Sequence, residues 1–100
     1  NLQVIGELTI YVPNAFSPNG DGLNDVFTPV INGLTENSYR LKVFNRWGEE
    51  IFKSDDITLG WDGTFKNEKC PPESYSWQLF VKSEYGVSSK TITGIVTLLR

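Results

Sequence analysis

The 100-residue chain carries a formal net charge of −3 and contains no histidine and a single cysteine. The absence of histidine excludes Ser-His-Asp catalysis, Cys-His catalysis and zinc hydrolysis in their usual forms, and the nine Lys and Arg residues form no stripe that would bind nucleic acid. Hydrophobic residues make up 39% of the chain and aromatic residues 13%, which predicts one folded domain with its own core. No pair of an acid and a base is expected to converge in strands, so we expect no enzymatic activity.

Six runs rich in β-branched and aromatic residues predict β-strands, and no segment has the pattern of a helix. In chain order the runs are Leu8–Val12, Asp25–Val30, Tyr39–Asn45, Glu49–Lys53, Ser74–Ser83 and Lys90–Leu99. Residues 1–7 precede them and are expected to be the end of a linker from a preceding domain, so the domain itself is expected to span 8–100.

Polar and apolar residues alternate along three of these runs, as they do in a sheet with one wet face. Tyr39, Leu41 and Val43 alternate with basic residues, Tyr75 to Val81 alternate with polar ones, and the threonines of the last run are expected to face solvent. Turn signals separate the runs. The pattern predicts an all-β fold, an immunoglobulin-like antiparallel β-sandwich of about seven strands, with a small barrel as the alternative.

The chain shows no apolar run of 18 residues, so no lipid-spanning segment is expected. It has no signal-peptide pattern and does not begin with Met, and we expect it to come from a longer protein and to be a monomer. Cys70 has no partner for a disulfide within the chain, and its position beside two prolines predicts a loop and an unreactive thiol.

Oxygen-bearing side chains and two glycines crowd the segment from residue 19 to residue 25. Carboxylate and amide oxygens are the ligands that calcium prefers, and glycine allows the backbone to turn several of them toward one point. The predicted ligands are Asn19, Asp21, Asn24 and Asp25, with Asp62, Asp55 or Asp56 as a more distant acid. The alternative is an ordinary tight turn in which Asn and Asp bond their own backbone.

A hairpin tip is predicted at Asn45-Arg46-Trp47-Gly48, where glycine can adopt a positive φ. Two interpretations of this tip are open. Arg46 and Trp47 are residue types that anchor partners in protein interfaces, which predicts a recognition knob. Alternatively, Trp47 folds back over the sheet as a packing residue.

The other aromatic and acidic residues have simpler interpretations. Trp61 and Trp77 are expected in the core, whereas a sugar-binding platform would need an exposed ring such as Phe44, Phe80, Trp47 or Tyr85. The acid pairs Glu49-Glu50 and Asp55-Asp56 do not predict a glycosidase, because adjacent residues of a strand point to opposite faces.

Four blocks in chain order carry a family resemblance. Val12–Phe27 contains Pro-Asn-Ala-Phe-Ser-Pro-Asn-Gly-Asp-Gly-Leu-Asn-Asp, Leu41–Phe52 reads Leu-Lys-Val-Phe-Asn-Arg-Trp-Gly-Glu-Glu-Ile-Phe, Trp61–Thr64 reads Trp-Asp-Gly-Thr, and Gly94–Arg100 is a closing strand. In this order they resemble the gliding motility-associated carboxy-terminal domain, the type B sorting domain of type IX secretion cargo. One position departs from the family, because Glu73 stands where members usually have glycine, which puts the usual turn there in doubt.

The resemblance implies a non-catalytic sorting signal that directs a large cargo protein to the cell surface or the medium. Its implied partners are the outer-membrane translocon or shuttle proteins of the type IX secretion system. The residues alone leave a second function open, an adhesive or carbohydrate-binding module on the same fold.

Overall fold

The computed structural model of the chain describes residues 2–5, 8–20, 22, 25–32, 34–83 and 89–100. This described part contains ten β-strands and no helix, so the predicted all-β class is confirmed and the predicted number of about seven strands is too low. The strands are β1 (Leu2–Ile5), β2 (Leu8–Tyr11), β3 (Ala15–Phe16), β4 (Val30–Asn32), β5 (Leu34–Phe44), β6 (Glu50–Ser54), β7 (Thr64–Phe65), β8 (Glu68–Lys69), β9 (Ser74–Ser83) and β10 (Ser89–Leu98).

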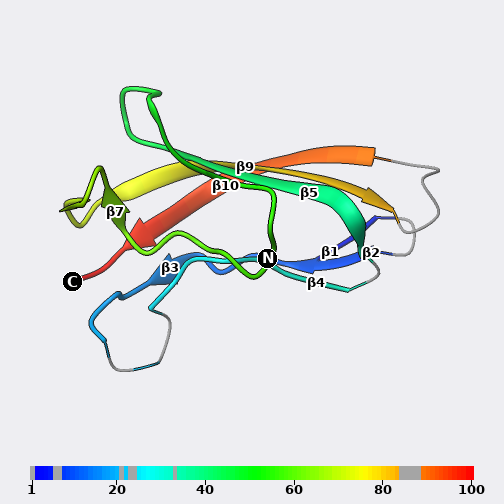
Figure 1. Ribbon diagram of the computed structural model, residues 1–100, viewed down its shortest axis with the longest axis horizontal. Coiled ribbons are helices and arrows are strands. Elements are labelled where there is room, and N and C mark those ends of the chain that lie inside the picture. The colour runs from blue at the N-terminus through cyan, green and yellow to red at the C-terminus, as the bar shows by residue number, and fades with distance from the viewer. Residues whose placement is uncertain (1, 6–7, 21, 23–24, 33, 84–88) are drawn as a thin grey trace.

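The strands form three sheets (Figure 1). The largest has the order β3-β10-β9-β5-β6, a second has the order β1-β2-β4, and β7 pairs with β8 as a small hairpin. All pairs are antiparallel except β3 with β10, which run parallel. The prediction of a wholly antiparallel fold is therefore wrong at β3.

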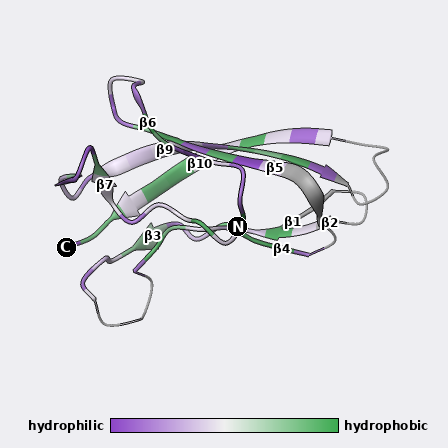
Figure 2. Cartoon of the chain, in the orientation of Figure 1, coloured by the Kyte–Doolittle hydropathy of each residue, from purple (hydrophilic) through white to green (hydrophobic). Residues whose placement is uncertain are grey.

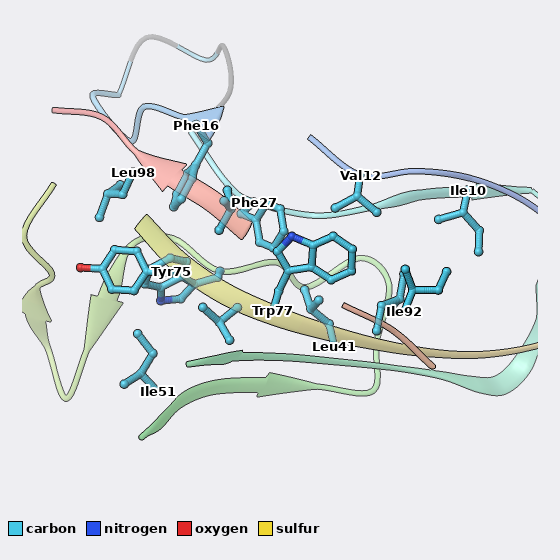
Figure 3. Close-up of a cluster of buried hydrophobic side chains, with 14 of the residues drawn as sticks. Ile10, Val12, Phe16, Phe27, Leu41, Ile51, Tyr75, Trp77, Ile92 and Leu98 are labelled. Atoms are coloured by element: carbon cyan, nitrogen blue, oxygen red, sulfur yellow. The ribbon is translucent and has the colours of Figure 1, made fainter. Parts of the chain in front are cut away.

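The five-stranded and three-stranded sheets lie in two layers, and the core lies between them (Figure 1). Figure 3 shows Ile10 and Val12 projecting from one layer toward side chains such as Leu41 and Ile92 of the other. All four side chains are buried. Burial of apolar surface between the two layers is the main stabilising contribution in this fold.

The long strands follow the predicted period of two, and Figure 2 shows the alternation of hydropathy along them. In β9, Tyr75, Trp77, Leu79 and Val81 are buried, while Lys82 is exposed. In β10 the threonines at 91 and 93 are exposed, as expected from the sequence. The predicted inner and outer faces of these strands are confirmed.

One predicted strand, Asp25–Val30, is wrong. Before Val30, only Phe27 of this segment has a β-type partner among the described residues, through an isolated bridge to Trp61 outside the strands, and β4 begins where the predicted strand ends. Pro29 explains the difference, because proline lacks the N–H that a continuous ladder needs.

The short strands were not predicted, because two-residue strands such as β3, β7 and β8 cannot show a period. The predicted linker, residues 1–7, overlaps β1, which pairs along its length with β2. Whether a linker precedes the domain stays a prediction.

Candidate functional site

The acidic loop is organised by one of its own carboxylates. The Asp25 carboxylate accepts hydrogen bonds from the backbone N–H groups of Asn19 (3.1 Å), Gly20 (3.0 Å) and Gly22 (2.7 Å). Gly20 and Gly22 both have φ near +80°, a conformation that glycine adopts without strain. The described part of this loop therefore has the local turn chemistry of the simpler interpretation.

The more distant predicted ligand, Asp62, has a local partner of its own. The Asp62 carboxylate accepts hydrogen bonds from the backbone N–H and the hydroxyl of Thr64, at 3.1 and 2.6 Å. Asp21 and Asn24 lie outside the described residues, and among the described ones no group of three or more acids and cysteines could hold a metal. These described residues do not fit a calcium shell, and the ion stays a prediction that depends on Asp21 and Asn24.

Aromatic side chains from separate motifs meet in the core. The ring of Phe16 lies 6.0 Å from that of Phe27 and 5.4 Å from that of Trp61, and Trp61 meets the edge of Tyr75 at 4.9 Å. Figure 3 shows Phe16 and Phe27 directed toward Tyr75 and Trp77. Trp61 and Trp77 are both buried, as predicted, so these aromatic side chains build the scaffold.

The Trp-Asp-Gly-Thr motif forms a turn, and the side chain of Arg100 binds to it. The indole N–H of Trp61 donates to the carbonyl of Thr64, and Gly63 has a φ of 85°. The Arg100 guanidinium donates to the carbonyl oxygens of Gly63 at 2.9 Å and Cys70 at 3.0 Å. The last residue thus ties β10 to the β7–β8 hairpin.

Glu73 does not disturb the turn in which it replaces the usual glycine. Among the described residues other than glycine, only Lys66 and Asn67 have a positive φ, so the backbone at Glu73 adopts a conformation open to any residue. Its carbonyl accepts from the N–H of Leu98, and its side chain lies 4.0 Å from Arg46. The doubt about this turn is therefore removed.

The β5–β6 turn exposes both residues predicted to recognise a partner. Trp47 is 75% exposed, and the Arg46 guanidinium lies over its ring at 4.5 Å from the centroid. The Asn45 side chain accepts from the backbone N–H groups of Trp47 and Glu49, and Gly48 has the predicted positive φ of 82°. Trp47 does not fold back into the core, so the packing interpretation is wrong.

A cleft of about 200 Å³ lies between this turn and the β7–β8 hairpin. Its lining combines apolar and charged side chains: Trp47, Ile51, Phe65, Glu68, Glu73 and Tyr75. The sequence did not predict this cleft, because it depends on the short hairpin folding against the β5–β6 turn. Its volume suits one apolar side chain of a partner.

The chemistry of the cleft does not favour catalysis. Burial raises the pKa of the Cys70 thiol above its ordinary value, which disfavours the reactive thiolate. Burial also raises the pKa of Tyr75 to about 12, and its hydroxyl donates to the carbonyl of Pro71 at 2.6 Å. Both groups stay protonated near neutral pH.

The paired acids are engaged in local contacts. Asp55 accepts a hydrogen bond from Arg40 at 2.8 Å, and this bond lowers the pKa of the Asp55 carboxyl. Hydrogen bonds from Thr58 lower the pKa of the Asp56 carboxyl. These contacts agree with the surface role predicted for the acid pairs.

The family description "CHU_C Type IX secretion signal domain" matches residues 10–98. The chain belongs to this family. The match covers most of the two layers and the closing strand, and it confirms the resemblance that the four sequence blocks suggested. A comparison with curated proteins found no match. No helix in the described part of this secretion signal domain is long and apolar enough to cross a membrane.

Proposed function

We propose that the domain is a non-catalytic sorting signal that directs a large cargo protein through the type IX secretion system to the cell surface or the medium. The family match over residues 10–98 carries this proposal. The arrangement of the motifs supports it, because their aromatic residues hold a rigid scaffold and leave its surface available for recognition. The proposed fold is the immunoglobulin-like sandwich, which the two layers in Figure 1 support.

Within this function, the recognition knob is Arg46 with Trp47, and the proposed partners are the translocon or shuttle proteins of the system. An exposed tryptophan beside a cleft with an apolar floor has the features of an interface anchor. The stacked guanidinium limits the motion of the ring, which lowers the entropy that docking would cost.

A reporter fusion tests the sorting function. Residues 1–100 are joined to the carboxyl end of a reporter in a bacterium with a working type IX system, and the reporter is measured inside the cell, on its surface and in the medium. We expect export of the fusion and retention of the reporter alone. Retention of both would refute the proposal.

A second function, binding of carbohydrate, is supported by one observation on the outer face of the five-stranded sheet. A hollow of about 260 Å³ is lined by Phe80, which is 38% exposed, and by Arg40, Lys42, Gln78 and Thr91. A ring beside amide, hydroxyl and cationic groups is a feature of sugar sites. A glycan array separates the two functions: binding lost in Phe80→Ala would support this one, and no binding would leave sorting alone.

A further inference from the structure

Strand β10 has an open stretch along one edge of the five-stranded sheet. It pairs with β9 from Ser89 to Thr97, but on its other side β3 pairs only with Thr97 and Leu98. Figure 1 shows β3 beside the end of β10. The stretch from Thr91 to Val96 therefore has no strand partner on that side among the described residues.

The backbone groups that point to this edge can be identified from the bonds at its covered end. Thr97 and Leu99 donate their N–H groups to the carbonyls of Asn14 and Phe16, on the β3 side, whereas Leu98 donates to Glu73 on the β9 side. Along a strand, successive residues direct their backbone N–H and C=O groups to opposite sides. The N–H and C=O groups of Thr91, Thr93 and Ile95 consequently point to the open edge.

Natural proteins usually protect such edges with charge, proline, bulges or shortness, and β10 lacks these devices. Its sequence from Thr91 to Leu98 contains neither a charged residue nor a proline, and its register with β9 is unbroken. The opposite edge, β6, is only five residues long, carries Glu50 and Lys53, and pairs with β5 across a register shift.

We propose that the open edge of β10 receives an extended segment of a protein of the secretion machinery, which adds a strand to the five-stranded sheet beside Thr91–Ile95. This inference rests on the proposed sorting function. Unpaired backbone N–H and C=O groups are complementary to another extended backbone, and strand addition is an established mode of peptide recognition. Ile95 is 58% exposed and offers the segment an apolar side-chain contact.

A second copy of the domain fits this edge less well than a segment of another protein. Two such edges would overlap only over the short open stretch, because β3 occupies Thr97 and Leu98 in each copy. A contact of that length cannot supply the roughly 1,000 Å² of buried surface that a stable interface needs.

The test uses the reporter fusion with a backbone block at the edge. Thr93→Pro removes the N–H that points outward and leaves the bonds to β9 in place, whereas Thr93→Ala is the matched control that keeps the N–H. We expect Thr93→Pro to slow export by at least about twofold, since one lost hydrogen bond alone weakens binding by about two- to tenfold. Thr93→Ala should export normally.

Ile95→Lys provides a second test that does not depend on tolerance of proline. It adds a charge to the edge at an exposed site, and Ser76→Lys adds the same charge to the same face on the inner strand β9. We expect Ile95→Lys to slow export and Ser76→Lys to leave it unchanged. Melting curves of the purified domains show that each variant is folded.

The outcomes separate the two proposals. Normal export of folded Thr93→Pro and Ile95→Lys would overturn strand addition and leave the sorting function standing. Retention of the unchanged fusion would overturn both. A wild-type dimer that Thr93→Pro makes monomeric, with export unaffected, would show that a second copy occupies the edge and would overturn the proposed partner.

Discussion

At Gly94 the strand leaves no room for a side chain larger than hydrogen. It lies opposite Trp77 in the β9–β10 pair, and a Cβ added to it would lie 2.4 Å from Cζ2 of the indole. The ring therefore covers the glycine directly, inside a strand where glycine is otherwise unfavourable. The fourth sequence block begins at this residue, and the close approach gives a physical reason for glycine there.

We predict that Gly94→Ala lowers the free energy of unfolding by about 1 to 3 kcal/mol, because the buried indole must move to admit the methyl group. Chemical denaturation with tryptophan fluorescence measures the change. Ser76→Ala, on the neighbouring strand, is the control and should change stability by less than about 0.5 kcal/mol. An unchanged midpoint for Gly94→Ala would show that the indole is not held against the strand.

Buried tyrosines predict a loss of stability at alkaline pH. Burial raises the pKa of both Tyr75 and Tyr39 to about 12, whereas a tyrosine of the unfolded chain ionises near 10.0. The unfolded state therefore loses these protons first. The contribution of these tyrosines to the free energy of unfolding should be constant below pH 10 and fall between pH 10 and 12, by at most about 1.4 kcal/mol per pH unit for each tyrosine.

Urea titrations at a series of pH values test this dependence, with Tyr75→Phe as the comparison. The variant loses the hydroxyl bond to Pro71 and should be less stable at neutral pH, but its stability should fall less steeply above pH 10. Equal slopes for the two proteins would contradict the proposed burial of the Tyr75 hydroxyl.

At the scale of elements, the sequence predicts the long strands in which polar and apolar residues alternate, and it misses the short elements that cannot show such a repeat. The period of two correctly assigned the faces of β9 and β10, because several residues of each strand share one environment. It could not predict β3, which consists of two residues between Pro13 and Pro18. The sequence left the role of Asp25 open between a loop turn and an ion ligand, because a carboxylate that binds its own loop has the same sequence signature as one that binds an ion.

The β7–β8 turn places two residues other than glycine in the left-handed region, with φ values of 53° at Lys66 and 65° at Asn67. Two-residue hairpin turns of this kind favour Asn-Gly. We predict that Lys66→Asn combined with Asn67→Gly raises the free energy of unfolding by about 0.5 to 1 kcal/mol, measured by urea denaturation. Asn67→Ala should lower it. A lower free energy of unfolding in the Asn-Gly variant would show that the Lys66 side chain stabilises the turn by more than its left-handed backbone destabilises it.

The acidic loop gives a prediction for ligand removal. We propose that calcium binds there through Asp21 and Asn24, together with a carboxylate oxygen of Asp25, because carboxylate and amide oxygens are the ligands that calcium prefers. Calcium at about 100 times its Kd should then stabilise the domain by roughly 2.7 kcal/mol, and a chelator should reverse the rise in melting temperature. Asp21→Asn should weaken the response. A melting temperature that does not change with calcium would refute the calcium site and leave the sorting proposal unaffected.

At the scale of the whole molecule, some of the four sequence blocks build the core and another presents side chains on the surface. The aromatic residues of the first and third blocks pack together in the core, and Arg100 fastens the end of the chain to the turn of the third block. The second block instead exposes its Arg-Trp tip at the cleft. Substitutions in these two parts should therefore affect folding and recognition differently.

We predict that Trp47→Ala changes the melting temperature of the domain by no more than about 2 to 4 °C, because the side chain is 75% exposed, and that it slows export of the reporter fusion. Phe16→Leu should do the reverse. Loss of its ring contacts with Phe27 and Trp61 should lower the melting temperature by several degrees, since about 1 kcal/mol corresponds to 4–8 °C for a domain of this size. Export of Phe16→Leu should persist at any temperature at which the domain stays folded. Normal export of Trp47→Ala would exclude the tip as a recognition site, because removal of the exposed indole would then have no effect on sorting.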